Sequence, residues 1–265
     1  MLPLQGSKME RGDKIYTKSI EENLYLSLSE KSRNELLGGD GNELGNDFNP
    51  GKIQALHSSS ALAVNFFEYW RANNDFSKIA KAIRIPSTNI SSIAYESKYP
   101  ILLDQEKHPN IDVCFKYKNG TIIGIECKFT EPFQNRINDH GLKDKYLKEA
   151  GIWDELPNLK KLASKLSPDD NEFQYLHCAQ LIKHTLGLLN SLKDKDKFRL
   201  VYLYYPALMG NNEKYNSEIE IFAEALTKDN IRFSSIIWQE LIKYFNENIT
   251  EQDKDYVNYV TNRYL

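Results

Sequence analysis

Residues 111–133 constrain the fold more than any other stretch, because they contain two runs in which apolar and polar side chains alternate. The first run spans 111–117 and the second spans 121–129, and in both the odd positions are mostly apolar. This period of two is typical of strands with one buried face. Asn119-Gly120 lies between the runs and is a strong signal for a hairpin turn.

The register of this hairpin follows from its apolar face. A two-residue loop would point the apolar side chains of the two strands to opposite faces. A three-residue loop at 118–120, with glycine in the left-handed conformation, keeps them on one face and pairs Tyr117 with Thr121. We therefore expect the three-residue loop.

That register places Asp112 opposite Glu126, with Lys128 two residues further along the same face. Two opposed carboxylates repel each other unless a positive charge lies between them. Mg²⁺ is the usual cation for such a site, held by carboxylates, water and a substrate phosphate. Lys128 would then orient the attacking water or stabilise the developing negative charge. A solvent-exposed hairpin face with mixed charges is the alternative, and the spacing alone leaves both open.

The same residues resemble the signature of the PD-(D/E)XK nuclease superfamily. Asp112 is followed by thirteen residues and then by Glu126-x-Lys128. The sequences of 109–113 (PNIDV) and 126–133 (ECKFTEPF) resemble a bacterial group of restriction-endonuclease-like proteins that carries P-x-(L/I)-D-V and E-(S/C)-K-F-T-E-P-F. The resemblance extends loosely from residue 58 to about residue 245 and is sharp only in this core.

The resemblance implies a restriction-endonuclease-like α/β fold, with a mixed central sheet flanked by helices. It implies a metal-dependent endonuclease acting on DNA, in a restriction or phage-defence setting. Asp112, Glu126 and the backbone carbonyl of Cys127 would hold Mg²⁺, with Mn²⁺ expected to substitute, and Lys128 would be the catalytic lysine. RNA remains open as a substrate, and a homodimer is compatible with cutting both strands. The alternative is a catalytically idle module that binds nucleic acid or a protein partner, against which the intact acidic pair and lysine argue.

Three further residues enter the site by resemblance. Glu96 lies in an expected strand at 93–99, and in this group an acid upstream of the aspartate can join the metal site. A surface glutamate beside Lys98 is the alternative. Gln180 and His184 lie on one polar stripe of an expected helix and resemble positions that bind substrate. Zinc is not expected, because the histidines lack the paired Cys/His spacing of zinc sites.

The pattern of helices and strands predicts an arm and loop at 1–52, followed by a nuclease-like domain at 53–265. The arm is expected to contain a helix at 15–33 and a glycine-rich loop at 38–51 that packs on the domain or on a neighbouring subunit. Residues 134–170 are expected to form short helices, either as a substrate-facing insertion or as a solvated face. The remaining expected elements are helices at 61–70, 76–83, 172–190, 217–229 and from 239 onward, and strands at 198–205 and 231–238.

Composition restricts the functional class. The net charge is −3 at pH 7, so contact with DNA has to come from a local basic patch. The three cysteines have no paired spacing and are expected to be reduced thiols. No apolar run reaches membrane-spanning length, and residues 1–5 lack the features of a signal peptide. We therefore expect a cytoplasmic protein without membrane contact.

Overall fold

The computed structural model describes residues 8–11, 14–46, 49–102, 108–130, 141–206 and 212–265. The strands in these ranges are β1 (Lys8–Arg11), β2 (Lys14–Thr17), β3 (Gly45–Asn46), β4 (Asn49–Pro50), β5 (Ile90–Lys98), β6 (Asn110–Tyr117), β7 (Ile122–Cys127), β8 (Phe198–Tyr204) and β9 (Phe233–Ile237). The α-helices are α1 (Glu30–Gly38), α2 (Ser59–Ala72), α3 (Phe76–Ala82), α4 (Asp144–Lys148), α5 (Pro157–Lys165), α6 (Cys178–Leu192), α7 (Asn212–Lys228), α8 (Trp238–Glu247) and α9 (Lys254–Tyr264).

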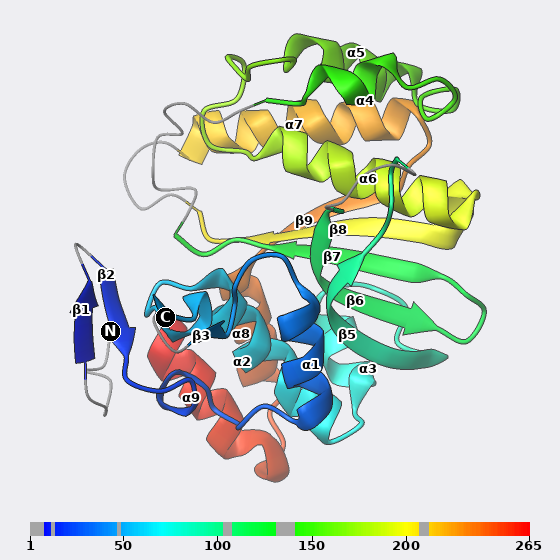
Figure 1. The fold of residues 1–265 in the computed structure, drawn as a ribbon. Coiled ribbons are helices and arrows are strands. Elements are labelled where there is room, and N and C mark those ends of the chain that lie inside the picture. Colours follow the sequence, from blue (N-terminus) through cyan, green and yellow to red (C-terminus); the bar gives the residue numbers. More distant parts are fainter. Residues whose placement is uncertain (1–7, 12–13, 47–48, 103–107, 131–140, 207–211) are drawn as a thin grey trace.

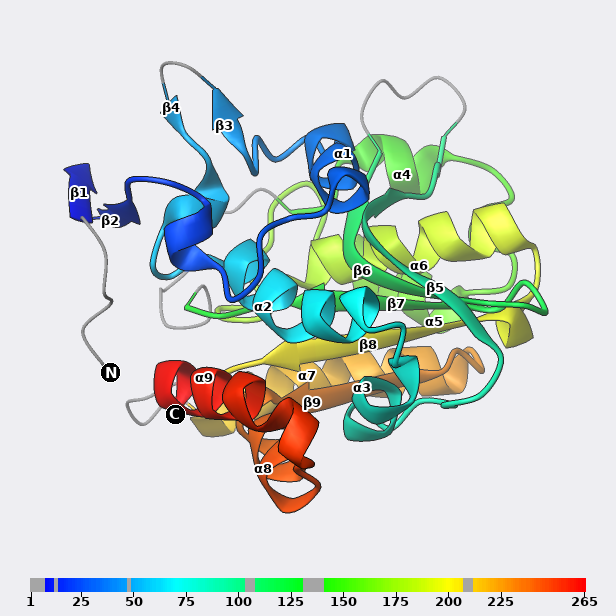
Figure 2. The same ribbon diagram turned by 90° about the horizontal axis from the view of Figure 1, so that it is seen from below.

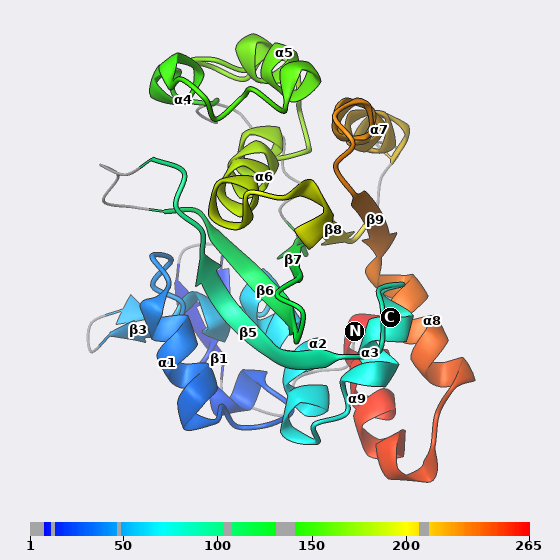
Figure 3. The same cartoon turned by 90° about the vertical axis from the view of Figure 1, so that its right-hand side faces the viewer.

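Strands β5 to β9 form the central sheet of the described chain, in the order β5-β6-β7-β8-β9. The β5–β6 and β6–β7 pairs are antiparallel, while β7–β8 and β8–β9 are parallel. Helices α6 and α7 cover one face, and α1, α2, α3, α8 and α9 lie on the other (Figure 1). Figure 2 shows the second group from below, in front of the sheet, and Figure 3 shows both layers edge-on. The expected mixed sheet flanked by helices is present and is compatible with a restriction-endonuclease-like fold.

The β6–β7 hairpin has the expected register. Val113 pairs with Ile125 and Phe115 pairs with Ile123. The Tyr117 N–H donates to the Thr121 carbonyl at 2.9 Å, which closes a three-residue loop. Gly120 has a φ of +82°, the left-handed conformation that such a loop requires of its glycine.

The alternation along these strands divides the core into two apolar layers. Val113, Phe115 and Ile125 pack with the residues of α2, α3, α8 and α9. Cys114 and Ile122 pack on the other side with residues of α5, α6 and α7. All described cysteines are buried, and no disulfide joins them.

The helix expected at 15–33 is wrong, because tertiary hydrogen bonds hold that segment in other conformations. Gln54 donates its side-chain amide to the carbonyls of Thr17 and Lys18, and Asn23 donates to the carbonyls of Ile53 and Ala55. The segment therefore forms β2 and a short 3₁₀ turn before α1 begins. Helix α1 begins where the Ser29 side chain accepts from the N–H of Ser32.

The helix expected at 172–190 begins six residues later than predicted, at Cys178. Glu218 of α7 is fully buried and accepts from the backbone N–H groups of residues 174, 175 and 176. These bonds hold the residues before α6 in an irregular conformation. The helices expected at 61–70 and 76–83 and the strand expected at 198–205 correspond to α2, α3 and β8.

Residues 141–170 form a cap of two short helices, α4 and α5, on the outside of the α6–α7 layer (Figure 3). Helix α5 begins at Pro157, where sequence analysis expected a break, because proline is well tolerated in a first helical turn. Residues 131–140, which include part of the motif and of the expected insertion, lie outside the described residues. The division into an arm and a domain at residue 52 stays a prediction.

Among the described residues, no helix is both long enough and apolar enough to span a bilayer.

Candidate active site

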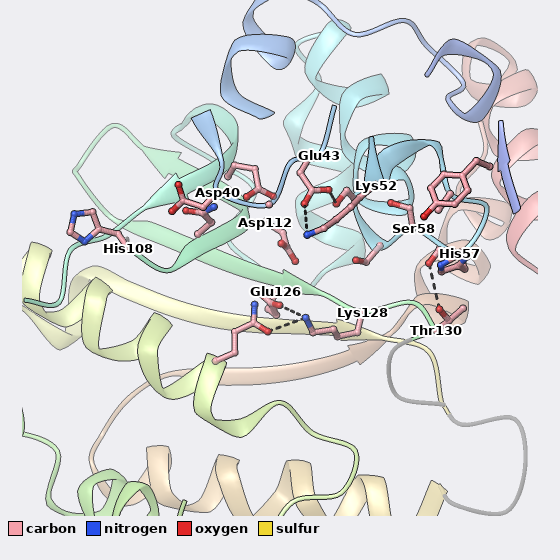
Figure 4. A pocket seen from close by; sticks show the side chains of 18 residues that line it. Asp40, Glu43, Lys52, His57, Ser58, His108, Asp112, Glu126, Lys128 and Thr130 are labelled. Atoms are coloured by element: carbon pink, nitrogen blue, oxygen red, sulfur yellow. Dashed lines mark hydrogen bonds and ion pairs between the residues drawn. The ribbon is translucent and has the colours of Figure 1, made fainter. Parts of the chain in front are cut away.

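A cavity of about 560 Å³ lies at the end of the β6–β7 hairpin (Figure 4). Asp112, Glu126, Lys128 and Gln180 line one side of it. Residues from 40–43 and 52–60, between the end of α1 and the first turn of α2, line the opposite side. The cavity therefore has one wall from the sheet and α6, and one wall from the N-terminal part of the chain.

Asp112 lies in β6, and its register places it opposite Glu126. Its Oδ2 accepts from the backbone N–H of Cys127 at 2.7 Å, which fixes the carboxylate between the two strands. Burial, and then the charges of Glu126 and Glu96, raise the pKa of Asp112 well above its usual range. Asp112 therefore lies beside two other carboxyl groups, those of Glu126 and Glu96, with Lys128 as the neighbouring positive charge that lowers its pKa.

Glu126 is fully buried, and both of its oxygens are held. Its Oε1 accepts from Lys128 Nζ at 2.6 Å, and its Oε2 lies 2.8 Å from His184 Nε2. Burial alone would raise the pKa of Glu126, but Lys128 and His184 outweigh burial and lower the pKa to about 2. Glu126 is therefore ionised across the ordinary pH range.

Lys128 follows the last residue of β7, and its backbone is fixed on both sides. Its N–H donates to the Leu203 carbonyl at 2.8 Å, and its carbonyl accepts from Trp238 Nε1 at 3.0 Å. Its Nζ also donates to Gln180 Oε1 at 3.0 Å. The side chain is 12% exposed, so the ammonium group is held at the cavity rather than free in solvent.

Glu96 lines the same cavity from β5. Its neighbours Tyr95 and Ser97 pair with Val113 and Ile111, which places Glu96 beside Asp112. Its φ of +46° is unusual for a residue other than glycine, and such strained positions cluster at functional sites. Burial, and then Glu43 and Glu126, raise the pKa of Glu96 to about 7.

Lys98, which was the alternative partner of Glu96, forms an ion pair with Asp40 at 2.9 Å instead. Glu96 therefore belongs geometrically to the acidic group of the cavity. Its role as a metal ligand stays a prediction.

Gln180 and His184 lie one turn apart on α6, as the expected polar stripe required. Gln180 lines the cavity and contacts Lys128, whereas His184 is 1% exposed and contacts Glu126. Their contacts in this structure are with the two residues of the Glu-x-Lys motif. Roles in substrate binding stay predictions.

The sequence pattern did not predict that the N-terminal segment forms a wall of the cavity. Glu43 is 6% exposed, accepts a hydrogen bond from Ser60 Oγ, and forms an ion pair with Lys52 at 3.6 Å. Ser58 caps the N-terminus of α2 by accepting from the Ala61 N–H. His108 is partly buried and also lines the cavity. The only local feature of Glu43 in the sequence was its place in a glycine-rich loop, and such a loop does not indicate which residues Glu43 contacts in the fold.

The donor atoms at the site suit a hard divalent cation. Among the described residues, no three His, Cys, Asp or Glu side chains meet as a complete ligand group. The carboxylates of Asp112 and Glu126 and the carbonyl of Cys127 supply oxygen, which is the ligand that Mg²⁺ prefers, and water normally completes its coordination. Burial, and then Glu126 and Glu96, raise the pKa of Asp112, and a cation beside it would favour its ionised form.

Comparison with known proteins gave one family. A family model described as "Restriction Endonuclease associating with ARP" matches residues 7–265. No curated protein and no solved structure matched the chain.

Proposed function

The chain belongs to the family of restriction endonucleases associating with ARP, and from this premise we propose that it is a Mg²⁺-dependent nuclease that hydrolyses phosphodiester bonds in DNA. The observation that carries the proposal is the convergence of Asp112, Glu126 and Lys128 on one cavity. An acidic pair with a lysine at hydrogen-bond distance is suited to phosphodiester hydrolysis, because the reaction needs a bound cation, an oriented water and neutralised phosphate charge.

In the proposed mechanism, Asp112, Glu126 and the Cys127 carbonyl hold the cation. When bound, Mg²⁺ lowers the pKa of water and neutralises charge on the scissile phosphate. Lys128 donates to the attacking water or to a phosphate oxygen, from a position set by Gln180 and by its fixed backbone. His184 keeps the Glu126 carboxylate in place. Mn²⁺ is expected to replace Mg²⁺.

The family description names association with ARP, so a protein partner belongs to the proposal. A restriction or phage-defence role, a homodimer and a cytoplasmic location are the further expectations that accompany it. The PD-(D/E)XK assignment of the motif also remains part of the proposal. A catalytically idle module of this family is the competing candidate, because both oxygens of Glu126 already have protein partners.

The test is cleavage of plasmid DNA, single-stranded DNA and RNA with Mg²⁺, with Mn²⁺ and with EDTA. Lys128→Ala should lower the rate by at least about 100-fold, as loss of one transition-state donor does. Lys118→Ala is the matched control, because Lys118 is exposed on the hairpin turn and away from the cavity. The control should cleave at the wild-type rate.

Calorimetric titration with Mn²⁺ gives a second readout that does not depend on turnover. We expect the wild-type protein to bind, and Asp112→Asn to bind more weakly. Absence of both cleavage and metal binding would refute the nuclease and favour the idle module. Metal-independent cleavage that survives Lys128→Ala would refute the mechanism.

A further inference from the structure

Two contacts join the two walls of the cavity. At one end, Lys98 of β5 forms an ion pair with Asp40 at 2.9 Å. At the other end, Thr130 Oγ1 donates to the His57 carbonyl at 3.5 Å. Figure 4 shows Asp40 and Thr130 on opposite sides of the cavity, with Asp112 between them. The N-terminal wall therefore faces the acidic pair across the cavity and contacts the opposite wall on both sides.

The groups that would act on a phosphate lie deep in this cavity. Glu126 is fully buried, and the Lys128 side chain is 12% exposed. A B-form duplex is a thick, stiff rod whose major groove alone is about 12 Å wide. Bringing one of its phosphates to Glu126 would require the space that residues 40–43 and 52–60 of the N-terminal wall occupy. The cavity volume of about 560 Å³ lies within the range of about 300–1,000 Å³ that is usual for small-ligand pockets, so an unpaired stretch of one or two nucleotides is a suitable occupant.

Tyr16 of β2 lines the same cavity and is, among the described lining residues, the only Phe, Tyr or Trp. It is partly buried, and its backbone pairs with Ala55 of the N-terminal wall. Aromatic side chains stack on the bases of single strands, because every unpaired base offers a π-face. In an intact duplex those faces are already stacked on neighbouring bases.

We infer that the cavity takes an unpaired nucleic-acid strand, such as a single strand, a strand end or a flap, in preference to an intact duplex, with Tyr16 stacking on one base. This inference rests on the proposed function and specifies its substrate. It follows from the second wall that faces the acidic pair, the low exposure of Glu126 and Lys128, and the aromatic side chain in that wall.

The first arm of the experiment compares cleavage of one labelled sequence in three forms with Mg²⁺: single-stranded, blunt duplex, and duplex with a single-stranded flap. Opening base pairs costs a few kcal/mol, so the blunt duplex should be cut at least about tenfold more slowly than the single strand. Cuts in the third form should fall in the flap. Cleavage of the blunt duplex as fast as the single strand would overturn the inference and leave the proposed nuclease intact.

The second arm measures binding without cleavage, using Lys128→Ala with Ca²⁺ and fluorescence anisotropy on the single strand and the blunt duplex. Adding Tyr16→Ala should weaken single-strand binding about 5- to 150-fold, which is the loss of one stacked base. Tyr16→Phe keeps the ring and should bind as before. Equal loss in both Tyr16 variants, or tighter binding to the duplex, would overturn the inference.

The two arms separate this inference from the proposed function. Single-strand binding without cleavage by the wild-type protein would refute the nuclease and retain the strand preference. Failure to bind or cut either form would refute both. Thermal unfolding of the Tyr16 variants shows whether they are folded. If they are not, the rates at which the wild-type protein cleaves the three substrate forms test the strand preference.

Discussion

Replacing Glu96 with glutamine should make the metal-free protein more stable at neutral and alkaline pH. Burial, and then Glu43 and Glu126, raise the pKa of Glu96 from its ordinary value of 4.5 to about 7. Each pKa unit corresponds to about 1.4 kcal/mol, so the ionised carboxylate opposes folding by about 3 kcal/mol. Glu96 keeps some exposure to solvent, and screening by that solvent reduces the expected effect to about 1–3 kcal/mol.

The sign of the pH dependence follows from the raised pKa. Below pH 4.5 the carboxyl group is protonated in both the folded and the unfolded chain, and it has no effect on the free energy of unfolding. Between pH 4.5 and about 7 the unfolded chain loses its proton first, so the wild-type protein becomes progressively less stable than Glu96→Gln. Above that range the difference is complete and constant.

Urea unfolding in EDTA at a series of pH values from acidic to mildly alkaline measures this difference. Glu172→Gln is the control, because Glu172 is exposed and remote from the acidic cavity. Adding Mg²⁺ should shrink the advantage of Glu96→Gln if a cation neutralises the acidic group. A difference between the wild-type protein and Glu96→Gln that does not change with pH would refute the reasoning.

Three other changes have expected outcomes. Gly187→Ala should lower the free energy of unfolding by about 1–2 kcal/mol, because the added Cβ would lie 2.5 Å from the Tyr99 carbonyl oxygen. Gly38→Ala should raise the free energy of unfolding by up to about 1 kcal/mol, because nothing lies within 4 Å of the added Cβ. Equal effects of the two changes in urea unfolding would contradict this. Glu218→Gln should destabilise by about 1–3 kcal/mol, because the amide nitrogen that replaces one carboxylate oxygen cannot accept, and at least one of the three backbone N–H donors loses its acceptor. An unchanged urea midpoint would argue against that role. His184→Leu should weaken Mn²⁺ binding about 10- to 100-fold in calorimetry, because it removes the support of Glu126, and unchanged affinity would mean that Glu126 does not hold the metal.

The hairpin could be predicted because its information is local. The alternation in β6 and β7 fixes which side chains are buried, and the position of Gly120 fixes the loop length. A shift of one residue would expose the whole apolar face, so few registers compete. Asp112, Glu126 and Lys128 follow from that register without any knowledge of the remaining chain.

The starts of α1 and α6 could not be predicted in the same way. Their residues have helical spacing, but side chains distant in sequence capture the backbone groups that a helix would use. Gln54 holds Thr17, and Glu218 holds the segment before Cys178. Intrinsic helix preference is weak enough that such tertiary hydrogen bonds override it.

The sequence by itself determined which face of the hairpin carries Asp112, Glu126 and Lys128. Adjacent strands and a short turn leave these side chains only one arrangement that buries the apolar residues. Tertiary structure alone decided what surrounds that face. Glu43, Lys52 and Tyr16 reach the cavity through the packing of the N-terminal segment, and His184 reaches Glu126 through the docking of α6. Contacts between residues so distant along the chain depend on how complete elements pack, and a local pattern in the sequence does not record that packing.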